Sequence, residues 1–233
     1  MTGVAAESRP RYSTFADILE RVGHVPAERI LPTPEPGTAT VVDVLRLAEG
    51  HPKRVVELVG GVLVEKPMGL REDYLGAWLI YLLQDYVTPK QLGAVLGSQA
   101  LVRFNLDVVR MPDVTFIRWD SLDDPDLIED PAEAFLDISP DFVIEVLSLS
   151  NTAKEMAIKL GEYAAAGVRL VWYVDPDAKE VTVYPKGKER GKKVLGLDGV
   201  LDGGSVLPGF TLPVAKIFEK RAPTKKLTKK RRG

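Results

Sequence analysis

One segment of the chain, residues 141–147, constrains the fold more than any other. It reads Asp-Phe-Val-Ile-Glu-Val-Leu, a nearly continuous apolar run that is typical of a strand buried on both faces of a sheet. A helix signal follows, because Thr152 and Glu155 have the spacing of a capping box and Gly167 is placed to end the helix. A second buried strand is predicted over residues 168–174. Strand, helix and strand in this order require a crossover, so the sheet must be at least partly parallel.

The rest of the chain predicts further elements around this unit. A hairpin is indicated where Gly60 and Gly61 separate two apolar runs at residues 54–59 and 62–65. A long helix is expected over residues 70–86, where apolar side chains recur at core spacing. Further short strands are expected at residues 94–96, 100–104, 113–117 and 181–184. The predicted class is therefore α/β, with a mixed β-sheet flanked by helices.

The chain is expected to hold one folded domain between two different ends. Its 233 residues suffice for one sizeable core. Residues 1–38 are expected to form an N-terminal extension, with one short helical pattern and a proline-rich stretch that resists helix and central strand. Residues 39–218 form the predicted domain, and residues 219–233 a basic C-terminal tail. The cations of the tail are Lys225, Lys226, Lys229, Lys230, Arg231 and Arg232. Such a tail is either a solvated segment or a contact for DNA.

Composition excludes several classes of protein. The absence of cysteine rules out disulfides and thiolate metal sites, and the two histidines, His24 and His51, stand far apart. No apolar run approaches the length of about 18 residues that a membrane helix needs, so no membrane contact is expected. The N-terminus lacks the apolar segment of a secretory signal, and we expect a cytoplasmic location.

Glu145 is the residue of this sequence that most needs a chemical explanation. It lies among apolar neighbours, where an unpaired carboxylate would cost several kcal/mol unless it meets a cation or a proton. Strand alternation places Val143, Glu145 and Leu147 on one face. Two interpretations stay open, namely a ligand of a metal ion and one half of a buried structural ion pair.

Asp113 is the second candidate ligand. It follows Pro112, which cannot donate a hydrogen bond and which fixes the direction in which the chain enters the next strand. By itself, a Pro-Asp pair is also typical of a turn. Two adjacent strands can bring Asp113 and Glu145 within reach of one hard cation, and an oxygen-only site suits Mg²⁺ or Mn²⁺.

Lys159 offers the positive charge that such a site needs. The apolar stripe of its predicted helix consists of Met156, Leu160, Tyr163 and Ala164. The far side is expected to hold Lys154, Glu155 and Glu162. Lys159 lies at the border of the stripe, so its ammonium could balance the carboxylates or stabilise the charge that builds on a phosphate. A lysine at such a border can also be a snorkelling side chain that only covers apolar surface.

Four linked segments resemble the Uma2 family. They are Met-Pro-Asp-Val-Thr-Phe-Ile from residue 111, Pro-Asp-Phe-Val-Ile-Glu-Val-Leu-Ser-Leu-Ser from residue 140, Lys-Leu-Gly-Glu-Tyr-Ala-Ala-Ala-Gly-Val from residue 159 and Val-Trp-Tyr-Val-Asp-Pro from residue 171. Glu57 also matches the family's Glu-Leu-x-x-Gly segment. Uma2 is a bacterial branch of the PD-(D/E)XK nuclease superfamily, described as candidate restriction endonucleases. The likeness covers about residues 40–218.

The resemblance implies a restriction-endonuclease-like fold in which Asp113 and Glu145 hold a divalent ion. The superfamily's usual lysine, two residues after the glutamate, is absent here, since that position is Leu147. Uma2-like proteins carry the lysine in the following helix, which Lys159 matches. Glu57 fits an additional acidic group near the metal or a structural residue, and Tyr163 is placed to hydrogen-bond at the same site. The family's histidine near the start of the long helix has no counterpart in residues 68–72.

The predicted function is a divalent-metal-dependent endonuclease that hydrolyses DNA phosphodiester bonds. Its site would consist of Asp113, Glu145 and Lys159, with Mg²⁺ (or Mn²⁺) held by the two acids. DNA is the expected partner, and a homodimer would suit cleavage of both strands. The alternative is an inactive nuclease-fold protein that binds nucleic acid or a protein partner. The missing histidine and the net charge of -2 favour this alternative. Glycoside hydrolysis by a carboxylate pair ranks far behind, because it gives Lys159 no role.

Overall fold

The computed structural model describes residues 12–67, 69–130 and 132–219. Its centre is a six-stranded sheet in the order β10-β9-β8-β7-β6-β3. Its strands are β3 (Gly93–Gly97), β6 (Val114–Arg118), β7 (Phe142–Val146), β8 (Leu170–Asp175), β9 (Glu180–Pro185) and β10 (Lys193–Leu195). The β7–β8 pair is parallel and the other pairs are antiparallel. The predicted α/β class with a mixed sheet is therefore confirmed, and helix α4 (Ala153–Ala165) makes the crossover.

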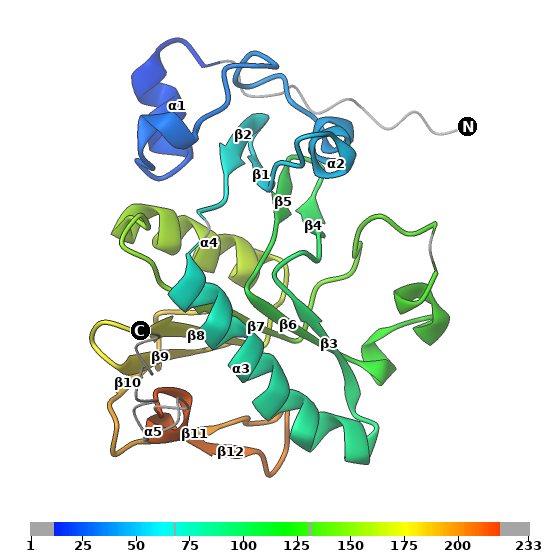
Figure 1. Cartoon of the computed structure of the whole chain (residues 1–233), viewed down its shortest axis with the longest axis vertical. Coiled ribbons are helices and arrows are strands. Elements are labelled where there is room, and N and C mark those ends of the chain that lie inside the picture. The colour runs from blue at the N-terminus through cyan, green and yellow to red at the C-terminus, as the bar shows by residue number, and fades with distance from the viewer. Residues whose placement is uncertain (1–11, 68, 131, 220–233) are drawn as a thin grey trace, which may run out of the picture.

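Two helices cover the two faces of this sheet, as the alternation along β7 requires. Phe142 and Ile144 belong to the apolar cluster that contains the buried face of α3 (Leu70–Val87). Val143 belongs instead to the cluster formed with α4. Figure 1 shows α3 running across the strands of the sheet. Glu145 has the same parity as Val143, so it points toward α4, among groups that can pair with it.

A second sheet of four strands, in the order β2-β1-β5-β4, lies beside the first (Figure 1). Its strands are β1 (Val56–Val59), β2 (Val62–Glu65), β4 (Val102–Asn105) and β5 (Val108–Arg110). The predicted hairpin is confirmed, with Gly60 and Gly61 at φ values of 58° and 75° that favour glycine. Strand β5 was not predicted, because three residues are too few for a periodic signal. It pairs with β1 and β4 and brings Arg110 into the interior.

The segment before the four-stranded sheet packs onto α4. It contains α1 (Phe15–Arg21) and α2 (Val41–Glu49), both begun by capping boxes. Arg29 Nη2 lies 2.8 Å from Glu155 Oε1, and both side chains are buried. Our expectation that Glu155 and Glu162 face outward was therefore wrong. The N-terminal segment covers Glu155, and Arg110 from β5 pairs with Glu162.

The C-terminal part of the described chain packs under α3. Strands β11 (Val200–Asp202) and β12 (Thr211–Pro213) form a small antiparallel pair, and α5 (Val214–Ile217) contacts α3. The sequence did not predict these short elements. The cations of the predicted basic tail lie outside the described residues. Within the described ranges, no helix combines the length and the apolar character that crossing a membrane demands.

Candidate active site

The pairing of β6 with β7 brings the two predicted acids together. Val114 is opposite Ile144 and Thr115 is opposite Val143, so the next step of the register sets Asp113 opposite Glu145. Asp113 Oδ2 accepts a hydrogen bond of 2.7 Å from the backbone N–H of Val146, which fixes the carboxylate at the end of β7. The strands thus supply the juxtaposition that the sequence could only suggest. The ligand roles of the two acids stay a prediction.

Glu145 belongs to a buried group of charges, here called the inner cluster. Its members are Glu57 of β1, Arg110 of β5, Glu145 of β7, and Lys159 and Tyr163 of α4. Lys159 Nζ lies 3.1 Å from Glu57 Oε1 and 3.2 Å from Glu145 Oε1. Arg110 Nη1 lies 2.9 Å from Glu57 Oε2, and the Tyr163 hydroxyl donates to Glu145 Oε1. Lys159 is only 2% exposed, so the snorkelling interpretation was wrong.

The electrostatics of the inner cluster differ between its two carboxylates. Burial raises the pKa of Glu145, and the Asp113 carboxylate raises it further, while Lys159 opposes both. Burial acts on Glu57 in the same direction, but Lys159 and Arg110 together outweigh it and hold the pKa of Glu57 below its ordinary value. Lys159 keeps its charge, because the two carboxylates raise its pKa in spite of burial, which lowers it. The cluster is therefore an ion-pair network, as one of the two interpretations of Glu145 predicted.

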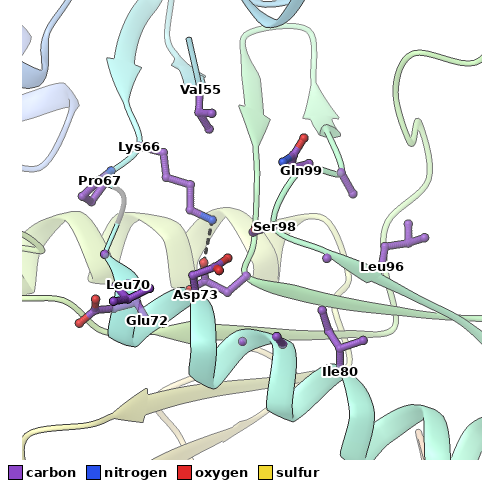
Figure 2. A pocket seen from close by; sticks show the side chains of 16 residues that line it. Val55, Lys66, Pro67, Leu70, Glu72, Asp73, Ile80, Leu96, Ser98 and Gln99 are labelled. Atoms are coloured by element: carbon purple, nitrogen blue, oxygen red, sulfur yellow. Dashed lines mark hydrogen bonds and ion pairs between the residues drawn. The ribbon is translucent and has the colours of Figure 1, made fainter. Parts of the chain in front are cut away.

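Asp113 takes part in a second, more open ion pair, here called the outer pair. Lys66, just after β2, places its Nζ 2.8 Å from Asp113 Oδ1 and also donates to the carbonyl of Met111. Lys66 and Asp113 both line a cavity of about 790 Å³, whose other walls come from Val55, Pro67, Gly69, helix α3 and residues 96–100. Figure 2 shows the Lys66 side chain extending toward α3, with its ion pair drawn as a dashed line. Sequence reasoning missed Lys66, because nothing near it in the chain connects it with Asp113.

The donor atoms of the site are carboxylate oxygens, which suit a hard divalent cation, but the site has only two carboxylates among the described residues. Asp113 and Glu145 offer oxygens, and Mg²⁺ is often held by one or two carboxylates with water and substrate oxygens as the other ligands. No hydrogen bond from a described residue reaches Glu145 Oε2, whereas Asp113 already binds Lys66 and Val146. Across the described part of the chain, no three Asp, Glu, His or Cys side chains gather as a metal site. A divalent ion between these strands would therefore have two carboxylate ligands at most, Asp113 and Glu145, and this ligand set stays a prediction.

Comparison with known proteins identifies the family of the chain and a solved structure with the same fold. The family model of Uma2, described as "Putative restriction endonuclease", matches residues 41–215. The chain is also similar to a crystal structure from Anabaena variabilis ATCC 29413, described as "a putative nuclease belonging to DUF820". The TM-score is 0.65 at 21% identity, and the match covers 77% of this chain and 97% of the other, so it shows a shared fold. Comparison with curated proteins gave no match. Since the family model spans most of the sequence, this chain belongs to the Uma2 family of nuclease-like proteins.

Proposed function

We propose that this protein is a divalent-metal-dependent endonuclease that hydrolyses DNA phosphodiester bonds. The observation that supports the proposal most is the position of Asp113 opposite Glu145, where a cavity of about 790 Å³ reaches Asp113. The descriptions of the Uma2 family and of its structural relative both name nucleases. Mg²⁺ or Mn²⁺ suits the two acids, because the donors are carboxylate oxygens.

Hydrogen bonds from neighbouring residues would orient the two carboxylates for binding of the ion. The Val146 N–H fixes Asp113, while Lys159 and Tyr163 fix Glu145 through the same oxygen, Oε1, and leave Oε2 for a ligand. Such outer partners orient metal ligands and tune their basicity. A bound divalent ion would supply positive charge that polarises the phosphate and favours ionisation of the attacking water. The charge of Lys159 compensates the buried carboxylates beside it.

Cleavage assays with plasmid and linear DNA in Mg²⁺ or Mn²⁺ test the proposal. We expect Asp113→Asn and Glu145→Gln to lower the cleavage rate by about 100-fold or more, as losses of central electrostatic groups do. Asp177→Asn is the matched control, because Asp177 is an exposed carboxylate paired with Arg71 outside the inner cluster. Cleavage by Glu145→Gln at the wild-type rate would exclude this site.

A second candidate function is binding of nucleic acid or of a protein partner without cleavage. It is favoured by the state of Asp113, whose two oxygens already accept hydrogen bonds from Lys66 and Val146. Calorimetric titration with Mn²⁺ separates the two functions. Saturable binding of Mn²⁺ that Glu145→Gln abolishes supports the nuclease, whereas DNA binding without Mn²⁺ binding supports the second candidate.

A homodimer belongs to the proposal, because two copies of the chain would place one site at each strand of a duplex. Sedimentation velocity of the protein with and without a DNA duplex tests this point. We expect a species of twice the monomer mass on DNA, and a monomer under both conditions would contradict it.

A further inference from the structure

We propose that Lys66, rather than Lys159, is the lysine of this site that contacts the substrate phosphate. The inference rests on the proposed nuclease function and deepens it. It reverses the roles that the sequence suggested for the lysines. Lys159 becomes a positioning residue that acts through Glu145, and Lys66 becomes the residue that meets the anionic substrate.

Lys159 is not placed to touch a substrate. Its side chain is 3% exposed, and its Nζ donates to Glu57 and to Glu145. It is absent from the lining of the cavity beside Asp113. To reach a phosphate, the ammonium would have to leave two buried carboxylates without their shared cation, which is strongly unfavourable. Its positive charge therefore stays inside the protein.

Lys66, unlike Lys159, lies at the wall of the cavity, where it can contact a substrate. Its side chain is 11% exposed and lines the cavity together with Asp113, one of the two proposed metal ligands. Its Nζ lies 2.8 Å from Asp113 Oδ1, so a phosphate that approaches an ion on Asp113 would arrive beside this ammonium. A lysine has three donor hydrogens on a flexible stem. Two acceptors are present here, Asp113 and the carbonyl of Met111.

The charges around the cavity explain why the substrate needs Lys66. Three acidic residues line the cavity, namely Glu72, Asp73 and Asp113. Among the described residues of the lining, Lys66 carries the one positive charge. Figure 2 shows Lys66 above the α3 segment that holds Glu72 and Asp73. A phosphodiester entering such a cavity is repelled unless a cation meets it, and Lys66 is the side chain that can do so.

A purely structural role for Lys66 is the competing explanation, since the ion pair with Asp113 also joins the end of β2 to the start of β6. The salt dependence of DNA binding distinguishes the two roles. Loss of one phosphate contact lowers the slope of log Kobs against log salt by about one. A residue that only holds two strands together leaves this slope unchanged.

The experiment measures binding of a fluorescent DNA duplex by anisotropy over a salt series, with Ca²⁺ in place of Mg²⁺. We expect Lys66→Met to bind about 10-fold more weakly at low salt, with the slope smaller by about one, and Lys66→Arg to restore the wild-type slope. Lys90→Met is the control, because it removes the same charge from an exposed side chain beyond the C-terminal end of α3. Circular dichroism checks folding, and Lys66→Gln replaces Lys66→Met if that variant does not fold.

Wild-type affinity and slope in Lys66→Met would overturn the inference, and so would a failure of Lys66→Arg to restore the slope. These failures differ from failure of the proposed function. If Glu145→Gln abolishes cleavage while Lys66→Met binds DNA as the wild type does, only the role of Lys66 is wrong. If the wild-type protein neither cleaves nor binds DNA, both proposals are wrong.

Discussion

The inner cluster and the outer pair contain the same kinds of groups in different surroundings. In the inner cluster, Lys159 and Arg110 are shared between carboxylates and are shielded from water. In the outer pair, Lys66 and Asp113 meet at the wall of a cavity, with exposures of 11% and 15%. The comparison shows that exposure to water determines whether a charged side chain can contact a molecule from solution. A buried, shared cation holds the fold and orients ligands, whereas a cation beside a cavity can exchange its partner for a substrate.

The inner cluster also joins parts of the chain that are distant in sequence. Glu57 and Arg110 come from the four-stranded sheet, while Glu145 comes from the six-stranded sheet and Lys159 from α4. The cluster therefore connects the two sheets at the site. A buried network of this kind need not add net stability, but removal of one member leaves an uncompensated charge. Substitutions in the inner cluster should consequently lower the free energy of unfolding more than substitutions in the outer pair.

The largest expected effect on stability is that of Lys159→Met. It leaves the buried Glu57 and Glu145 without their shared cation, and we expect the free energy of unfolding to fall by about 3–5 kcal/mol. Urea denaturation measures this change. Lys154→Met, on the exposed side of the same helix, is the control and should cost much less. Equal losses in the two variants would mean that the inner cluster does not stabilise the protein.

Glu57→Gln should have the next largest effect, and the effect should depend on pH. At about pH 7 we expect a loss of about 2 kcal/mol, because hydrogen bonds to charged groups weaken. The pKa of Glu57 is lowered from its ordinary value of 4.5, so the unfolded chain binds the proton more tightly. The stability that Glu57 contributes is therefore present above about pH 4.5 and is lost as the pH falls below it. Denaturation curves between about pH 7 and pH 3 should show a constant difference down to about pH 4.5 and a narrowing difference below it, and a difference that stays constant to pH 3 would contradict the lowered pKa of Glu57.

Tyr163→Phe is expected to have an intermediate effect. The hydroxyl donates to the carboxyl group of Glu145, which also pairs with Lys159, so its loss should cost about 1.5 kcal/mol. Tyr173→Phe is a matched control, since that hydroxyl donates over 2.7 Å to the neutral carbonyl of Met156. We expect about 1 kcal/mol for the control. Thermal or urea unfolding measures the free energy of unfolding of both variants. A larger loss in Tyr173→Phe would show that the hydrogen bond from Tyr163 to Glu145 contributes little to stability.

The smallest expected effect on stability is that of Lys66→Met, in contrast with its expected effect on DNA binding. Its ion pair is partly exposed, and Asp113 keeps the Val146 N–H, so the loss should be about 1 kcal/mol or less. The measurement is the same urea denaturation as for Lys159→Met. A loss as large as that of Lys159→Met would remove the distinction between the outer pair and the inner cluster.

Much of the fold could be predicted where local sequence and tertiary environment agree. The apolar run of β7 had to be buried, the capping box at Thr152 began α4 where expected, and Gly60-Gly61 formed the hairpin. The face of Glu145 also followed from strand alternation. Short elements escaped prediction, among them β5 and the β11–β12 pair, because three residues carry too little periodic signal.

The partners of each charge could not be predicted, because they come from distant parts of the chain. Glu155 has the pattern of an exposed helix residue, yet Arg29 reaches it across 126 positions. Arg110 lies in β5, a strand of three residues that is too short for a periodic hydrophobic pattern. Nothing in the sequence around Lys66 indicates that Asp113 lies beside it.

The sequence by itself determined that a carboxylate in a buried strand must have a cation near it, since desolvation makes any other outcome costly. It also determined the strand–helix–strand unit that carries that carboxylate. Only the tertiary structure decided which cations are sealed in the interior and which reach the cavity. The packing of two sheets and an N-terminal segment settles that question, and these are long-range contacts that no local pattern encodes.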